Sequence, residues 1–175
     1  EVNVDVMYDN LMNKFDFGNM ELPDVYLDET ARRLTYNLRT IYGRLASSLV
    51  ENGRKEDALK VVDLAMSKMP VDKYGFDYFI LSLLEAYYKA GDAEKARMYI
   101  DMFADNLDNE LAYYKQFKGS EKRAIAQDIQ SAGQYYQMLF QLVQQYEVRT
   151  PMTEQNLAKN DMFVRYQNAV QPFGM

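Results

Sequence analysis

The strongest constraint on the fold is a pattern of small, apolar and turn-forming residues between Asn37 and Pro70. Its positions are Tyr42, Leu45, Ala46, Leu49, Gly53, Ala58, Val62, Ala65 and Pro70. The apolar spacing predicts two helices, and Gly53 supplies the left-handed residue that ends the first of them. Ala58 and Ala65 are small enough for the second helix to lie close against the first, and Pro70 stops it. The stretch therefore predicts two antiparallel helices joined by a tight turn.

The pattern recurs 38 positions later. There Leu83, Tyr87, Gly91 and Ala96 take the places of Leu45, Leu49, Gly53 and Ala58. This spacing resembles the tetratricopeptide repeat, a helix–turn–helix unit of about 34 residues. The excess over that length falls in Val71–Phe76, which we expect to be an irregular connection. The resemblance implies an all-α fold of helix pairs, at about 39–72 and 77–110, stacked as a right-handed superhelix.

Residues 1–27 predict a lead-in segment with one short amphipathic helix. Val4, Met7 and Leu11 keep helical spacing, and Phe17–Asn19 contains a break. We expect this helix to pack on the first repeat; the alternative is that its apolar face docks on an upstream domain. The chain begins at Glu1 rather than Met and shows no signal-peptide pattern, so we expect a piece of a longer protein.

Acidic residues mark the expected helix starts in the repeat domain, residues 28–147. Asp28, Asp77 and Asp92 each precede a helical pattern, where a carboxylate can accept hydrogen bonds from the first free amides. They predict helices that begin near residue 28, at 78 and at 93, the last of which should reach about Leu107.

The region 109–147 predicts capping helices rather than a further repeat. Asn109–Phe117 has the pattern of a short helix ended by Gly119, and Ser120 that of a cap for a long helix reaching Glu147. One face of the long helix is apolar; the opposite face carries Gln127, Gln130, Gln134, Gln137, Gln141 and Gln144. We interpret the glutamines as the solvated face of a terminal helix, with a partner surface as the alternative. Residues 148–175 predict a weaker helical tail, over 153–170, with a frayed end.

Composition excludes several kinds of chemistry. The chain has no cysteine and no histidine, which removes thiolate nucleophiles, the commonest general base and most transition-metal sites. Its net charge of −6 is unfavourable for contact with phosphate backbones or anionic membranes. No apolar run reaches the roughly 18 residues of a membrane span. We therefore expect no nucleic-acid partner, no membrane insertion by this segment, no cofactor and no bound metal.

Two groups of carboxylates are candidates for acid–base chemistry. One group is Asp101, Asp105 and Asp108, on one helix face; the other is Asp24, Asp28 and Glu29, at the start of the first long helix. Paired carboxylates can hydrolyse a glycosidic bond, but nothing in the pattern indicates the apolar pocket that would raise the pKa of one of them. We interpret both groups as solvated helix ends and caps, and predict no catalytic residue.

The fifteen tyrosines are the other conspicuous feature. Three doublets occur, at Tyr87-Tyr88, Tyr113-Tyr114 and Tyr135-Tyr136. In each doublet we expect only one ring to face the core, which leaves the second partly exposed. We interpret the rings mainly as helix packing, with a platform that stacks glycans or peptides as the alternative.

The tetratricopeptide resemblance also implies a binding groove, lined by the first helix of each repeat. The corresponding positions are Thr40, Gly43, Ser47, Val50 and Glu51 in the first repeat, and Tyr78, Leu81, Glu85, Tyr88 and Lys89 in the second. Chaperone-binding members of the family clamp a terminal carboxylate with Lys and Asn at two of these positions. Here those positions hold Gly43 and Ser47, so the resemblance does not imply that activity.

A closer resemblance rests on short motifs spread over most of residues 5–147. They are Met7-Tyr8-Asp9-Asn10, Asn13-Lys14-Phe15, Asp24-Val25-Tyr26-Leu27-Asp28-Glu29, Arg32-Arg33 and Tyr87-Tyr88-Lys89-Ala90-Gly91. Together they resemble the C-terminal soluble region of a large Bacteroidetes-type membrane-protein family of unknown function. The multi-span N-terminal part of that family is similar to protein O-mannosyltransferases that use lipid-linked sugars.

This resemblance implies a non-enzymatic interaction or scaffold module on the periplasmic side of the inner membrane. Its partner would be a protein or peptide, such as the membrane part of its own parent chain. The family's expected catalytic carboxylates would lie in that membrane part, outside this sequence. The alternative function is a receptor groove that binds a glycan or peptide through exposed tyrosines.

Overall fold

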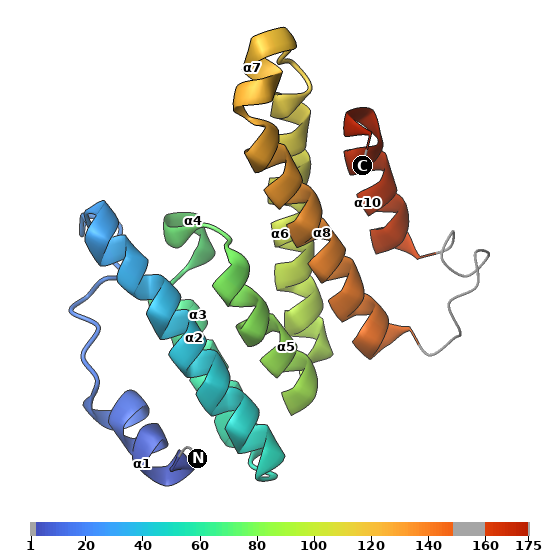
Figure 1. The fold of residues 1–175 in the computed structure, drawn as a ribbon. Helices are drawn as coiled ribbons and strands as arrows, with labels where there is room; N and C mark the ends of the chain where they lie inside the picture. Colours follow the sequence, from blue (N-terminus) through green and yellow to red (C-terminus); the bar gives the residue numbers. More distant parts are fainter. Residues whose placement is uncertain (1–2, 149–159, 175) are drawn as a thin grey trace. The chain divides into compact units, whose positions relative to one another are not determined.

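The computed structural model describes residues 3–148 and 160–174 of the 175-residue chain (Figure 1). Every regular element in these two ranges is helical and none is a strand, which confirms the predicted all-α class. The chain forms two compact units, residues 1–96 and 97–175.

A long helix and its return partner form the framework of the first unit. α2 (Glu29–Glu51) ends in a turn where Gly53 has a φ of +76°, and α3 (Lys55–Lys68) runs back along it (Figure 1). The Arg54 amide closes the turn by donating to the Leu49 carbonyl at 2.8 Å. The two helices bury Tyr42, Leu45, Ala46, Leu49, Ala58, Val61, Val62 and Ala65 completely. Both predicted helices and the turn between them are confirmed.

The connection after α3 is more regular than expected. Pro70 has no amide hydrogen and cannot continue α3, and it starts the single helical turn α4 (Val71–Tyr74). The Pro70 carbonyl accepts from the amides of Lys73 and Tyr74 at 3.1 and 3.0 Å. The expectation of an irregular connection is therefore wrong for its first four residues.

The third long element starts as a 3-10 turn, η2 (Tyr78–Ile80), and continues as α5 (Leu81–Ala90). Asp77 caps it as predicted, because its Oδ1 accepts from the amides of Phe79 at 2.7 Å and Ile80 at 3.1 Å. α5 packs against both α2 and α3, which explains why it buries side chains on almost every side.

The lead-in segment of the first unit packs on α2. α1 (Val4–Asp9) continues into a π-helical turn, η1 (Asn10–Lys14). The Tyr42 hydroxyl donates to the Leu11 carbonyl at 2.8 Å, and the rings of Tyr42 and Phe17 lie 5.8 Å apart. Burial of the hydroxyl raises the pKa of Tyr42 to about 12.

The loop after η1 is held by a lysine of α4. The Lys73 ammonium donates to the carbonyls of Met20 at 2.8 Å and Val25 at 2.7 Å, and also to that of Leu22. The Tyr74 hydroxyl donates to the same Met20 carbonyl at 2.6 Å. Two adjacent side chains of α4 therefore fix three carbonyl groups of the lead-in loop.

The helix that begins at 93 is longer than the sequence pattern indicated. α6 (Ala93–Tyr114) starts after the predicted cap Asp92, whose Oδ1 accepts from the Lys95 amide at 3.0 Å. It passes through Leu107 without a break, so the separate short helix expected over Asn109–Phe117 is wrong. The reason is physical: no glycine or proline lies between these two patterns to interrupt the backbone.

The long helix expected from Ser120 is divided into two. α7 (Gly119–Ala124) begins after Lys118 rather than Ser120, and α8 (Ala126–Glu147) follows a break at Ile125. The predicted apolar face of α8 is buried at Ile129, Ala132, Tyr136, Leu139 and Val143. On the opposite face five of the six glutamines are exposed and Gln144 is half-buried, as expected for a solvated face.

The last described helix, α10 (Asp161–Val170), is capped by Asn160, whose side-chain oxygen accepts from the Phe163 amide at 2.9 Å. Its rings contact α8, with Phe163 5.2 Å from Phe140 and Tyr166 6.0 Å from Tyr136. The chain continues as a 3-10 turn over 171–173, within the stretch that was expected to be frayed. The predicted start of the tail, residues 153–159, lies outside the described residues.

Candidate functional site

The expected groove positions lie on α2, η2 and α5 of the first unit, where α2 and α5 are in direct contact. One close contact between them is at Gly43. A Cβ atom added to Gly43 would lie 2.3 Å from the Ser82 Oγ and 2.8 Å from the Ser82 Cβ, closer than real atoms pack. Glycine at this position is therefore what allows the two backbones to come together.

The groove positions differ in how far they reach solvent. Six of them are half-buried: Thr40, Ser47 and Val50 on α2, and Leu81, Glu85 and Lys89 on α5. Glu51 and Tyr78 are exposed, whereas Gly43 and Tyr88 are buried. We call the half-buried and exposed members together the α2–α5 face. Tyr88, with 8% of its surface exposed, contributes to the core rather than to this face.

The polar groups of the α2–α5 face are partly satisfied within their own helices. The Thr40 hydroxyl donates to the Tyr36 carbonyl at 3.0 Å, and Lys89 pairs with Glu85 at 3.1 Å. Because Lys89 and Glu85 neutralise each other, the exposed Glu51 is the remaining charge of the face. The face therefore offers hydroxyl groups, aliphatic carbons, the Tyr78 ring and one acidic side chain.

An aromatic cluster of Tyr36, Tyr78 and Phe79 lies at the start of η2. The Tyr36 and Phe79 rings are stacked with centroids 5.4 Å apart, and Tyr78 meets Phe79 edge-on at 5.7 Å. Tyr78 keeps 55% of its surface exposed. This ring is the one predicted groove tyrosine that a ligand could reach.

A buried arginine fixes the geometry of this site. Arg39 is fully buried and forms an ion pair with Asp77, the residue that caps η2. Its guanidinium also donates to the carbonyls of Gly75 at 3.1 Å and Met69 at 3.2 Å. Arg39 therefore ties α2 to the end of α3 and to the start of η2.

Sequence reasoning missed the role of Arg39, although a signal was present. Arg39 lies three residues before Tyr42 and four after Thr35, on the same helical stripe, and all three are buried. A charge on an apolar stripe indicates a buried ion pair, because an unpaired charge there would be too costly. The acidic partner could not be identified, since Asp77 is distant in the sequence.

The tyrosine doublets behave differently from one another. Tyr87 and Tyr88 are both buried, so the expectation that one ring of this doublet stays exposed is wrong. The reason is that α5 has neighbours on two sides; the Tyr87 hydroxyl also donates to Asp63 of α3 at 2.7 Å. In the other two doublets one ring is more exposed than its neighbour, at Tyr113 and Tyr135.

The carboxylates of α6 are engaged by arginines of the second unit. Arg97 contacts Asp101 at 3.0 Å, and Arg165 of α10 contacts both Asp105 and, at 2.7 Å, Asp108. Asp108 also accepts from the Tyr136 hydroxyl at 2.9 Å. The Arg165 pairs join α10 to α6, and the Arg97–Asp101 pair lies within α6. Within residues 3–148 and 160–174, no group of three acidic side chains is arranged to hold a metal ion.

The second acidic group lies on the surface of the first unit. Asp24, Asp28 and Glu29 are exposed, and Glu29 pairs with Arg33 at 2.6 Å on the first turns of α2. Their positions agree with the interpretation as a solvated helix start.

Searches for related proteins add no further constraint. Comparison with protein-family models, with curated proteins and with solved structures found no match to this chain. In the part of the chain that the structure describes, no helix combines the length and apolarity needed to cross a bilayer. What the protein does is therefore inferred from the geometry of its own surfaces.

Proposed function

We propose that this chain is a tetratricopeptide-like interaction module that binds a polypeptide along the α2–α5 face and has no enzymatic activity of its own. The observation that supports it best is the contact at Gly43 and Ser82. Because Gly43 brings no side chain to this contact, α5 packs closely on α2 at Ser82, and the half-buried residues of the two helices can serve as one binding surface. In this proposal the helix pairs belong to a right-handed superhelix whose inner side is this surface.

The chemistry of the face fits an extended peptide of mixed composition. The carbons of Val50 and Leu81 offer apolar contact, and the hydroxyls of Thr40 and Ser47 can bond to a peptide backbone. Gly43 and Ser47 replace the Lys and Asn of the chaperone-binding members, so a terminal carboxylate is not the expected anchor. The ligand is an internal segment rather than a chain end.

The sequence resemblance supplies the proposed context. We infer that the module lies on the periplasmic side of the inner membrane and serves a glycosyltransferase-like membrane protein, its own parent chain being the first candidate partner. The ion pairs of Asp101, Asp105 and Asp108 with arginines support a non-enzymatic role, since these carboxylates are already occupied by structural contacts.

Selection from a random peptide library on the intact chain tests this proposal. Selected peptides should bind the unmodified protein, and Leu81→Asp should weaken their binding about tenfold or more, because a carboxylate is then buried against the peptide. The matched control is Val164→Asp, the same change at an exposed apolar residue of α10. Peptides that bind both variants as tightly as the unmodified protein would exclude the α2–α5 face as the binding surface.

A second candidate, glycan binding, is favoured by one observation. Tyr78 is exposed beside the stacked Tyr36 and Phe79 rings, and an exposed aromatic ring of this kind can stack on a sugar. A glycan array probed with the unmodified chain and with Tyr78→Ala distinguishes the two functions. Glycan signals that disappear in the variant would support glycan binding. An array without signals would exclude glycan binding and leave peptide binding as the proposed function.

A further inference from the structure

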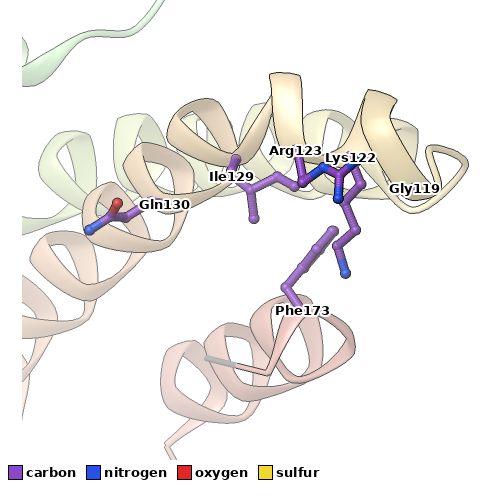
Figure 2. A pocket seen from close by; sticks show the side chains of 7 residues that line it. Gly119, Lys122, Arg123, Ile129, Gln130 and Phe173 are labelled. Atoms are coloured by element: carbon purple, nitrogen blue, oxygen red, sulfur yellow. The ribbon is translucent and has the colours of Figure 1, made fainter.

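The second unit contains a hollow of about 500 Å³ that the sequence did not reveal (Figure 2). Its walls come from the consecutive helices α7 and α8 and from a 3-10 turn distant in the sequence. The lining residues are Gly119, Lys122 and Arg123 of α7, Ala126, Ile129 and Gln130 of α8, and Phe173 of the 3-10 turn over 171–173. Figure 2 shows Lys122 extending beside the Phe173 ring. We call this hollow the α7–α8 pocket.

One side of the α7–α8 pocket carries two positive charges. The Lys122 ammonium lies 5.5 Å from the centre of the Phe173 ring. Among the described residues, neither Lys122 nor Arg123 forms an ion pair with a carboxylate, in contrast to Arg97 and Arg165 of the same unit. The acidic residue of α7, Glu121, does not line the pocket. Two cations therefore face this hollow without a compensating anion.

The other side of the pocket is apolar. Ile129 is 5% exposed, and its side chain forms the wall together with Ala126 and the Phe173 ring. Small-molecule sites are hollows of roughly 300–1,000 Å³ with mostly apolar walls and a few polar groups. The α7–α8 pocket has this size and this division of surface.

The charge of the whole chain restricts which anion could bind here. With a net charge of −6, the protein repels polyanions, so a nucleic acid or a multiply phosphorylated ligand is disfavoured. A single anionic group attached to an apolar body meets less repulsion and gains contact with the apolar wall. An arginine fork matches the two oxygens of a carboxylate, and the lysine beside it adds a second positive charge.

We propose that the α7–α8 pocket binds a monoanionic amphiphile, a carboxylate on a medium-length aliphatic chain. The carboxylate pairs with Arg123 and Lys122, and the chain lies against Ala126, Ile129 and Phe173. This site lies in the second unit and does not depend on the function proposed for the α2–α5 face.

Calorimetric titration of the full chain with decanoate, below its micelle concentration, tests the proposal. Decanoate should bind saturably with one site per chain, whereas acetate and decyltrimethylammonium should not. Absence of saturable decanoate binding would overturn it. If decyltrimethylammonium binds as well as decanoate, the association is apolar only. If acetate binds as well, the pocket holds an adventitious ion only. Either result would also overturn the proposal.

Variants locate the site. Lys122→Gln with Arg123→Gln should weaken decanoate binding about tenfold or more, because two charge-assisted contacts are lost. The matched control, Lys115→Gln with Lys118→Gln, removes equal charge from nearby positions outside the lining and should change little. Ala126→Phe should block binding by filling the hollow, with an unchanged circular dichroism spectrum as proof of folding. Decanoate binding that survives both the double variant and Ala126→Phe would refute the assignment.

Discussion

Each unit of the protein contains an arginine that holds a helix in place, but the two arginines work under different conditions. Arg39 in the first unit has no exposed surface and reaches Asp77 and two backbone carbonyls. The Arg165 side chain in the second unit is 28% exposed, and its partner Asp105 is 68% exposed. Arg39 and Arg165 have similar numbers of partners, but water reaches the Arg165 side chain and not that of Arg39.

This difference determines what each contact contributes to stability. When one member of a buried pair is removed, the other charge is left without either its partner or water, which is costly. An exposed pair competes with water and is screened by salt, so its loss costs little. The comparison predicts that the buried arginine is essential for folding and that the exposed one only secures α10.

The largest effect is expected for Arg39→Ala. It leaves the half-buried Asp77 and the carbonyls of Gly75 and Met69 without their partner and should lower the free energy of unfolding by about 3–5 kcal/mol. Urea unfolding followed by circular dichroism measures it, with the exposed Arg33→Ala as control. Asp77→Asn sharpens the result, because asparagine keeps the cap of η2 and removes only the charge. A loss for Arg39→Ala no larger than for Arg33→Ala would refute the role of the buried pair.

Ala58→Leu tests the close contact of α2 and α3 in the first unit. Ala58 is fully buried, and a larger side chain should overpack the helix pair and destabilise it by about 1–3 kcal/mol. Ala96→Leu, at the equivalent position, should behave alike. The exposed Ala112→Leu of α6 provides the control. Thermal melts in which both Ala58→Leu and Ala96→Leu match the unmodified protein would show that the small side chains are not required.

Gly43→Ala tests the approach of α2 and α5. The added methyl group collides with Ser82, which should cost about 1–3 kcal/mol, while the better helix propensity of alanine returns up to about 1 kcal/mol. Adding Ser82→Gly removes the collision and should restore the unfolding midpoint. If Gly43→Ala is as stable as the unmodified protein, the contact that supports the proposed binding face is looser than described.

Arg165→Gln gives the second half of the arginine comparison. Because the pairs with Asp105 and Asp108 are partly exposed, we expect a loss of about 0.2–1 kcal/mol that diminishes as salt rises. Urea unfolding at low and high sodium chloride measures both quantities. A loss as large as that of Arg39→Ala, or one independent of salt, would contradict the distinction between the two units.

The smallest effect is expected for Gln134→Ala. Gln134 lies on the exposed face of α8, so its removal should change the free energy of unfolding by less than about 0.5 kcal/mol. A larger destabilisation would indicate that the glutamine face is covered by another surface in solution.

The parts of the fold that could be predicted are those set by neighbouring residues. Gly53 with Ala58, and Gly91 with Ala96, mark a turn and the start of a close helix contact within a few positions of each other. Asp77 identified the start of the third helix in the same way. Turns, caps and small residues act locally, so a single sequence reveals them.

The parts that were missed depend on contacts between distant positions or on the absence of a signal. The pairing of Arg39 with Asp77 and the meeting of Phe173 with Lys122 join residues that only the folded chain brings together. The break at Ile125 has no glycine or proline to mark it. Tyr88 was expected to line a groove because it matches a groove position of the tetratricopeptide pattern, but the packing of α5 on two helices buries it.

Lys73 has a practical consequence for chemical labelling. Its ammonium is occupied by carbonyl oxygens of the loop between Met20 and Val25, and only an amine that leaves them can attack an acylating reagent. Acetic anhydride should therefore modify Lys73 more slowly than lysines whose ammonium groups are exposed to solvent. The rate depends on how often the loop moves away from Lys73. Peptide mapping of the acetylation rate of Lys73 would measure how often the lead-in segment opens locally.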